Sequence, residues 1–367
     1  MRWLPSIGRI TLTTAALLAA TEAWSAPLSP FIPTMEKKAD EKSPRTTSVP
    51  SRLPMLDNHA AWTRLPGAPA SEETLPSWAR QLAGPLPQAT AQMLRLDALH
   101  RTGDRLDPKL RALMRWMAAD ANQCAYSKAL AESDLKRAGH APAGLVARDS
   151  AKLSPDEKTA LLFAKKLTTD GASVTDEEVQ SLIQAFGESK VVAMVALIAH
   201  ACFQDRVLLA LNPPIESDGP PPPVQAVFPH KRTPPMPPGG APGSKGKAGG
   251  PPATTSEKPL GANLEDVAGT WKDQTFDDLL KQLNRQRERK ARIRIPDWPE
   301  VEARLSADSW ALRLPRVLWN RVCYGHQPEL TDGWFDCVDA FRQETKFNRM
   351  LSQDIFWVVT RSINCFY

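Results

Sequence analysis

The chain has 367 residues, of which 42% are hydrophobic, and a formal net charge of +5. This length gives room for two domains of ordinary size, and the hydrophobic content is sufficient for packed cores. The mildly basic net charge is only a weak argument for a polyanionic partner, and we expect no nucleic acid. We found no phosphate-binding loop, Ser-His-Asp set or metal-ligand spacing, and therefore predict no cofactor.

The first 26 residues are typical of a secretory signal peptide. Arg2 and Arg9 supply positive charge, and residues 10–20 form an apolar stretch. The alternative is an uncleaved membrane anchor, but the apolar stretch is shorter than the roughly 20 residues that span a membrane. We therefore expect export to the periplasm or cell surface. Residues 27–73 are rich in Pro, Ser, Thr and charge, which predicts a disordered tether.

A helical domain is predicted over residues 74–212. Asp107 and Pro108 are expected to start an amphipathic helix, with a break at residues 122–123 and a new helix from about Cys124. Ser154 and Thr175 each precede a Glu by three residues, as in a capping box. These signals predict helices at 155–168 and 176–186, followed by the most apolar helix at 188–211. Without any strand signal, the fold class is all-α.

A Pro/Gly-rich segment at 213–259 separates this domain from a second helical region at 260–367. Such a composition predicts a disordered spacer, with a docking site for a proline-recognition module as the alternative. In the second region, the basic residues between Arg285 and Arg294 are interpreted as a solvated helix face, because no aromatic residues are interleaved. The alternative partners there are nucleic acid and anionic lipid.

The second region repeats the first. Cys124 and Cys365 lie 241 positions apart, and at the same offset Leu110 corresponds to Leu351 and Trp116 to Trp357. Upstream, the tripeptide Ser-Trp-Ala occurs at residues 77–79 and again at 309–311. This offset of 232 rather than 241 implies a small insertion between the two motifs of the repeat. The second copy stops at Tyr367, within the segment that carries its cysteine, so we expect this unit to be truncated. The odd number of cysteines, five, fits a missing partner.

A cysteine at the first turn of a helix has its thiolate stabilised by the positive end of the helix dipole. Two helices that meet at Cys-x-x-Cys, with a His one turn later, are the layout of the carboxymuconolactone decarboxylase-like, or alkyl hydroperoxide reductase D-like, superfamily. Residues 106–212 resemble a whole unit of this family, and residues 310–367 resemble the first half of another. The resemblance implies two tandem helical units and thiol-dependent reduction of hydroperoxides, with an external thiol donor.

Carried over position by position, the resemblance places the first cysteine at Cys124 and the second at Ser127. The His position is Ala131, and the upstream carboxylate position is Ala112. In the second unit Cys365 matches the first cysteine, with Gln353 or Asp354 upstream. Ser127 cannot form a disulfide, so the first unit is predicted to be impaired. The candidate catalytic residues are Cys365, Cys124 and Ser127.

Two function hypotheses therefore remain. The first is a peroxiredoxin-type antioxidant enzyme centred on Cys365, and the second is a non-enzymatic helical binding or scaffold protein descended from the same fold. The family resemblance implies a homo-oligomer, or packing of one unit on the other. His200 with Cys202 is interpreted as a core pair, and Cys323 with Cys337 as a disulfide candidate in an oxidising compartment.

Overall fold

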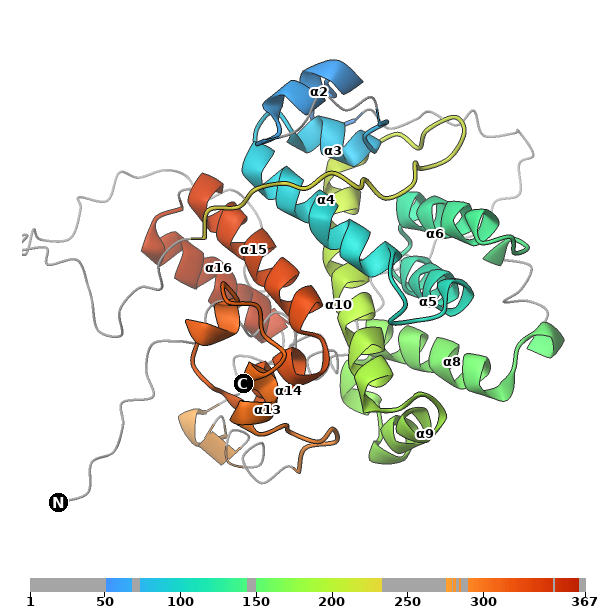
Figure 1. The fold of residues 1–367 in the computed structure, drawn as a ribbon, viewed down its shortest axis with the longest axis vertical. Helices are drawn as coiled ribbons and strands as arrows, with labels where there is room; N and C mark the ends of the chain where they lie inside the picture. Colours follow the sequence, from blue (N-terminus) through green and yellow to red (C-terminus); the bar gives the residue numbers. More distant parts are fainter. Residues whose placement is uncertain are drawn as a thin grey trace, which may run out of the picture. The chain divides into compact units, whose positions relative to one another are not determined.

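The computed structural model describes residues 51–67, 73–143, 150–232, 275–278, 280–281, 284, 290–345 and 347–362. Throughout these residues the ordered elements are helices and no strand is present, so the all-α prediction is confirmed (Figure 1). The expected signal peptide, most of the tether and spacer, and Cys365 lie outside the described residues. The prediction of a disordered tether is wrong for Asn58–Arg64, which form a helix with Trp62 buried. Two compact units are distinguished. The larger contains the described parts of 11–233 and 291–365, and the smaller includes residues 234–290.

The first half of the larger unit starts with five helices. These are α2 (Asn58–Arg64), α3 (Ser77–Leu82), α4 (Pro87–Arg101), α5 (Pro108–Ala121) and α6 (Ala125–Arg137). The predicted start of α5 is confirmed, because the Asp107 carboxylate accepts a hydrogen bond from the backbone N–H of Leu110, and Pro108 occupies the first helical position. Gly103 follows α4 and Gly139 follows α6, both with positive φ.

Three longer helices complete this half: α8 (Pro155–Thr169), α9 (Asp176–Phe186) and α10 (Glu188–Leu211). Both predicted capping boxes are present, at Ser154 with Glu157 and at Thr175 with Glu178. α10 is long and apolar enough to cross a membrane on length and composition, but most of it is buried among the other helices. Its first two-thirds pack on α5, α8 and α9, and its end packs near α3.

The second half contains α13 (Trp298–Glu302), the short 3₁₀ turn η4 (Trp310–Leu312), α14 (Leu318–His326), α15 (Pro328–Thr345) and α16 (Arg349–Ser362). The sequence predicts a separate domain beginning at residue 260, joined to the first through a linker. The described residues from 291 onward instead belong to the same compact unit as the first half. The reason is the packing of α15 along α4, which is one of the two most extensive helix pairs in the structure.

The helix starts repeat along the chain at an offset of 241. Starting residues Ser77, Pro87 and Pro108 of α3, α4 and α5 correspond to those of α14, α15 and α16, which are Leu318, Pro328 and Arg349. This register pairs Trp78 with Trp319 rather than with Trp310, which corrects the expected offset of 232. The correction arises because Trp310 lies in η4, before the helix that corresponds to α3.

Backbone geometry and hydrogen bonds repeat with the helices. The residue before α4, Leu86, has φ −139° and ψ 61°, and its counterpart before α15, Gln327, has φ −142° and ψ 62°. Arg80 Nε donates to the carbonyl of Leu56 at 2.8 Å, and Arg321 Nε donates to the carbonyl of Pro296 at 2.9 Å. The two donors correspond at the offset of 241, whereas the acceptor is one residue earlier in the second half.

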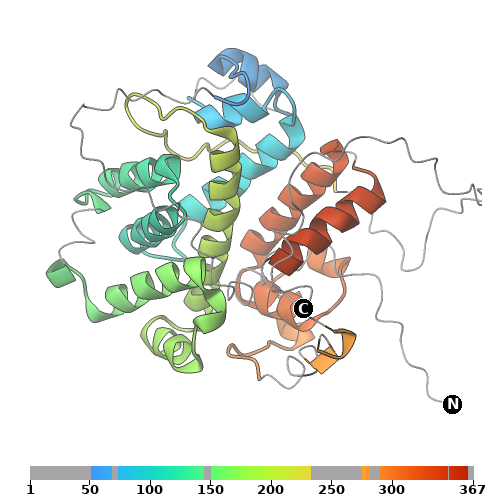
Figure 2. The same ribbon diagram turned by 180° about the vertical axis from the view of Figure 1, so that it is seen from behind.

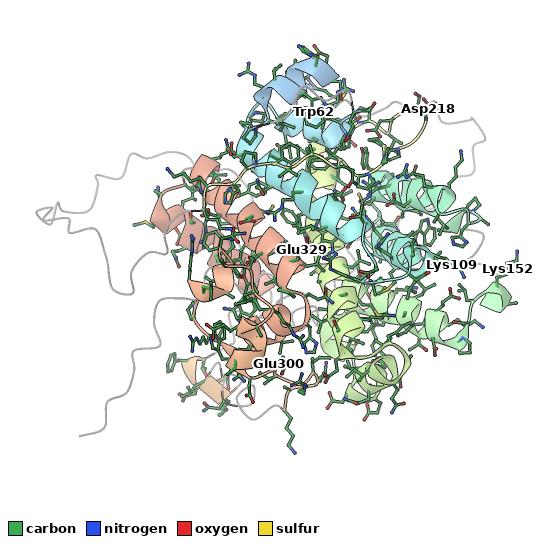
Figure 3. All side chains as sticks on the ribbon, viewed as in Figure 1. Trp62, Lys109, Lys152, Asp218, Glu300 and Glu329 are labelled. Carbon is green, nitrogen blue, oxygen red and sulfur yellow. The ribbon has the colours of Figure 1, made fainter. Side chains whose placement is uncertain are left out.

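The helices α4 and α15 run antiparallel, so that the start of each meets the end of the other (Figures 1 and 2). At one end the Glu344 carboxylate accepts from the backbone N–H groups of Gln88 and Ala89, both at 2.7 Å. At the other end Arg105 pairs with Glu329, which is labelled in Figure 3. Between them Arg95 contacts Asp336, which is 241 positions away. Polar contacts at both ends and in the middle thus hold the two antiparallel helices together.

Residues 213–232 contradict the prediction that the spacer is disordered from residue 213. They run as an extended segment, which we call the strap, from the end of α10 past α3 to α15 (Figure 1). Phe228 of the strap is buried and stacks on Trp62 with ring centroids 6.1 Å apart. Arg232 binds the Asp336 carboxylate. The carbonyls of Pro220 and Pro221 in the strap accept hydrogen bonds from Arg137 and Arg101 of the helices.

The basic cluster is only partly described. Arg292 and Arg294 precede α13 in non-helical backbone, so the interpretation as a helix face is wrong for these two residues. Arg292 pairs with Asp176 at 2.6 Å, and Arg294 pairs with Glu300 at 2.7 Å. Both charges are thus engaged within the fold.

Candidate functional site

The α5–α6 junction places Cys124 where the sequence predicts it. Gln123 has φ +55°, a left-handed conformation that turns the chain between the helices. The backbone N–H of Cys124 then donates to the Ala119 carbonyl at 2.9 Å, and Cys124 becomes the N-cap residue of α6. The thiol therefore lies at the positive end of a helix dipole, as expected.

The same junction buries the thiol. Cys124 is 1% exposed. Burial is the largest influence on its pKa and raises it above the ordinary value, and the nearby Asp205 carboxylate raises it further. The helix dipole is thus outweighed, because a thiolate without solvent beside a carboxylate is costly. At neutral pH the Cys124 side chain is a thiol rather than a thiolate.

Ser127, which the resemblance places at the second cysteine, has its neighbours on α10. The buried Ser127 hydroxyl lies close to both the Cys124 thiol and the Asp205 carboxyl group, although its Oγ has hydrogen-bond geometry to neither. Asn122 Nδ2 donates to Asp205 Oδ2 at 2.8 Å and lies 3.8 Å from the Cys202 Sγ. Burial raises the pKa of Asp205, so this cluster combines a carboxyl group, two thiols and a hydroxyl in one buried site.

The positions that the resemblance assigns to the His and the carboxylate hold no acid–base group in the first half. Ala131 and Ala112 are buried apolar residues. In the second half Asp354 is exposed on α16 and Gln353 is half-buried. The structure thus brings Cys124 and Ser127 together, whereas Cys365 falls outside the described residues.

A second polar cluster lies deeper between α4, α5 and α10. Asp97, which is 3% exposed, accepts from Arg101 Nη1 at 2.8 Å and from Arg115 Nη2 at 3.3 Å. Burial alone would raise the pKa of Asp97, but Arg101, His200 and Arg115 hold it well below its usual range. The carboxylate is therefore charged at all ordinary pH values and anchors both guanidinium groups.

Two buried histidines border this cluster. The rings of His100 and His200 stack with centroids 4.4 Å apart and planes 7° apart. Burial lowers the pKa of both histidines, and the Arg115 charge lowers it further, so the rings are neutral at pH 7. His200 faces Asp97, whereas Cys202 lies near Asn122. His200 and Cys202 therefore point in different directions, as expected for two buried core residues rather than a shared site.

The structure corrects the disulfide candidate. Cys323 and Cys337 are both free thiols, buried in the core of the second half, and no bond joins them. Burial raises the pKa of Cys323 to about 12. Within the described part of the chain, no group of three His, Cys, Asp or Glu side chains can hold a metal ion.

Sequence reasoning missed the Asp97 cluster entirely. The signal was present, since Gln204 and Asp205 are polar residues within the most apolar helix, and Asp97 lies among buried leucines of α4. What the sequence does not reveal is that α4, α5 and α10 bring these residues together with Arg115. No protein-family model matches the chain, and no similar protein was found among the curated proteins or the solved structures.

Proposed function

We propose that this chain is a non-enzymatic helical binding protein, built from two copies of an alkyl hydroperoxide reductase D-like unit, and that α16 presents the binding face. The support is the contrast between the two halves. In the first half the residues needed for a dithiol cycle are replaced, and the remaining Cys124 is buried and protonated. In the second half an apolar helix face is open to solvent.

The open apolar face consists of four side chains, each four positions after the previous one; three lie on α16 and the first lies two residues before it. Their exposed fractions lie between 43% and 55%. They are Phe347, Leu351, Ile355 and Val359. An apolar stripe with this spacing is normally buried, because side chains at i and i+4 lie on one face of a helix. We call these four residues the α16 stripe.

The α5 counterparts of the α16 stripe are all buried, at 4% exposure or less. They are Leu106, Leu110, Met114 and Ala118. Two helices, α8 and α10, pack on α5 and bury this face, with Phe163 and Leu167 of α8 in the same core cluster. The repeat therefore indicates which kind of element covers an α5-like face.

The occupant we infer for the α16 stripe is a helical partner with an apolar face like that of α8. With Met350, the stripe exposes on the order of 500 Å², a patch size that is often functional. A stable twofold dimer needs about 800 Å² from each partner, so the stripe alone is too small for a face-to-face contact with a second copy. A partner helix that packs along α16 covers it more completely.

A labelled peptide of residues 154–169, which form α8 and its cap, is a direct probe of this face. We expect saturable binding to the full-length protein in a fluorescence anisotropy titration. The double substitution Leu351→Glu with Ile355→Glu is expected to abolish binding without unfolding the protein, because both side chains are exposed. A peptide with Phe163→Ala and Leu167→Ala, which removes the apolar anchors, is the control probe.

The matched protein control is Leu318→Glu, since Leu318 is an exposed apolar residue of α14 outside the stripe. It is expected to leave peptide binding unchanged. Absence of saturable binding, or binding that the double substitution does not weaken, contradicts the proposal. Reversible dimerisation that the double substitution abolishes identifies a second copy as the occupant and contradicts the partner proposed above.

A second candidate function, peroxide reduction at Cys365, keeps one supporting observation. α16 has the same length as α5, and the segment after α16 carries Cys365 as the segment after α5 carries Cys124. The test is hydroperoxide consumption by full-length protein with a dithiol donor. Loss of turnover in Cys365→Ser but not in Cys124→Ser favours the enzyme, and no turnover at all favours the binding protein. Export to the periplasm or cell surface stays part of this proposal and is tested by fractionation.

A further inference from the structure

A cavity of about 220 Å³ lies between α4, α5, α6 and the strap. Four arginines and one carboxylate line it, together with His100 and several apolar side chains. The charged lining residues are Arg101, Arg111, Arg115, Arg137 and Asp134. Including Asp97 behind the wall, four positive charges face two negative ones. The lining of the cavity therefore carries an excess of positive charge.

The hydrogen-bonding capacity of two of the arginines is largely taken up by other groups of the protein. Arg101 binds Asp97, Asp134 and the Pro221 carbonyl, all between 2.8 and 2.9 Å. Arg137 binds Asp134 at 2.6 Å and two strap carbonyls. These two residues hold α4, α6 and the strap together, and they have little capacity left for a ligand.

The other two arginines are under-satisfied. Arg115 is 1% exposed, and only its Nη2 makes hydrogen bonds, to Asp97 and Gln204, whereas Nε and Nη1 make none among the described residues. Arg111 is half-buried and, among the described residues, donates through Nη1 to backbone carbonyls. Burial lowers the pKa of Arg111, as expected for a guanidinium whose nearest carboxylates are engaged elsewhere. Leaving the buried donors of Arg115 without acceptors is costly, so this group calls for an explanation.

The neutral histidines add to this picture. The pKa of His100 is lowered by burial and by the nearby positive charge, so the ring contributes donors and acceptors without charge. A pocket with unpaired guanidinium groups and a neutral imidazole matches the chemistry of an oxyanion, whose oxygens accept two parallel hydrogen bonds from each arginine.

We propose that this cavity binds a small oxyanion, a carboxylate or a phosphate, with Arg111 and Arg115 as its principal ligands and His100 beside it. The volume admits a ligand of a few heavy atoms beyond the anionic group, since one water occupies about 30 Å³ of liquid. The strap, through Pro223, forms part of the wall, so the ordered strap and the site depend on each other. This proposal is independent of the α16 stripe.

Calorimetric titration of the full-length protein with inorganic phosphate and, separately, with acetate tests it. We expect saturable binding of at least one of the two, and the comparison assigns the anion class. Arg111→Gln is expected to weaken binding by about tenfold or more, the usual effect of losing a charged hydrogen bond, whereas Arg111→Lys retains part of the affinity. Arg115→Gln is a second variant with the same expected direction.

Arg64→Gln is the control, because Arg64 is exposed in the last turn of α2 and does not line the cavity. It is expected to leave the affinity unchanged. No saturable binding of either anion to the folded protein overturns the proposal. Equal weakening by Arg111→Gln and Arg64→Gln also overturns it, since that result describes a general electrostatic attraction rather than a built site.

Discussion

Asp336 is the residue whose loss should most weaken the contact between the two halves. Its side chain is 1% exposed and accepts from Trp310 Nε1 at 2.8 Å and from Arg232 Nε at 2.7 Å, and it also pairs with Arg95. Asp336→Asn keeps the shape and removes the charge. Two guanidinium groups then lose their common carboxylate, and one of the two, Arg232, is largely buried.

Removing one partner of a buried ion pair typically lowers the free energy of unfolding by roughly 3–5 kcal/mol. Because Arg95 is about one-third exposed and water compensates it, we expect the lower end, about 3 kcal/mol. The measurement is a urea unfolding titration of the full-length protein, read as a lower midpoint at unchanged slope. Asp308→Asn is the control, since the Asp308 side chain is 73% exposed and pairs with the same Arg232 at 3.2 Å.

The reasoning is refuted if Asp336→Asn costs no more than Asp308→Asn, which should cost less than about 1 kcal/mol. The pH dependence gives a second check. Burial alone would raise the pKa of Asp336, but hydrogen bonds from Arg232 and Trp310 outweigh it and lower the pKa. The contribution of Asp336 is therefore complete above the pKa of an unfolded Asp and declines as pH falls towards the folded pKa. The Asp336→Asn variant should lack this acid-dependent part of the stability loss.

Two further predictions concern glycine and cysteine. A Cβ added to Gly325 would lie 2.4 Å from the Pro296 ring, whereas one added to the equivalent Gly84 would lie 3.8 Å from Leu56. We therefore expect Gly325→Ala to lower the free energy of unfolding by about 1–3 kcal/mol in a urea titration. Gly84→Ala is expected to change it by nothing measurable. Equal effects would contradict the close packing of Gly325 against Pro296. Cys124 should react with a thiol reagent only as fast as the protein unfolds, because it is buried and its pKa is raised. Rapid alkylation of Cys124 in the native protein, measured by mass spectrometry, would instead restore it as a nucleophile candidate.

Local signals in the sequence predicted local structure well. The capping boxes at Ser154 and Thr175 start helices where expected, and the α5–α6 break falls at Asn122 and Gln123. These features depend on side chains within three or four positions, so a short window contains the whole interaction. The position of Cys124 at the start of α6 followed from the same local reasoning.

Non-local packing explains what the sequence left out. Proline-rich composition predicts that a segment forms no helix, but not whether its carbonyls find donors, and here Arg101 and Arg137 supply them to the strap. The reactivity of Cys124 was likewise a question of tertiary contacts. Its helix position favours a thiolate, whereas α10, 80 residues downstream, brings Asp205 beside it and buries it.

The measurement that tests the central claim most directly is photo-crosslinking of the α8 peptide to the full-length protein. The photoreactive group replaces Leu167 of the peptide, on the face that packs in the core, and the crosslinked residues are mapped by mass spectrometry. We predict crosslinks concentrated on α16, around Leu351 and Ile355. Crosslinks scattered over the surface, or confined to α5 and its neighbours, would contradict the claim that the α16 stripe is a binding face for a helical partner.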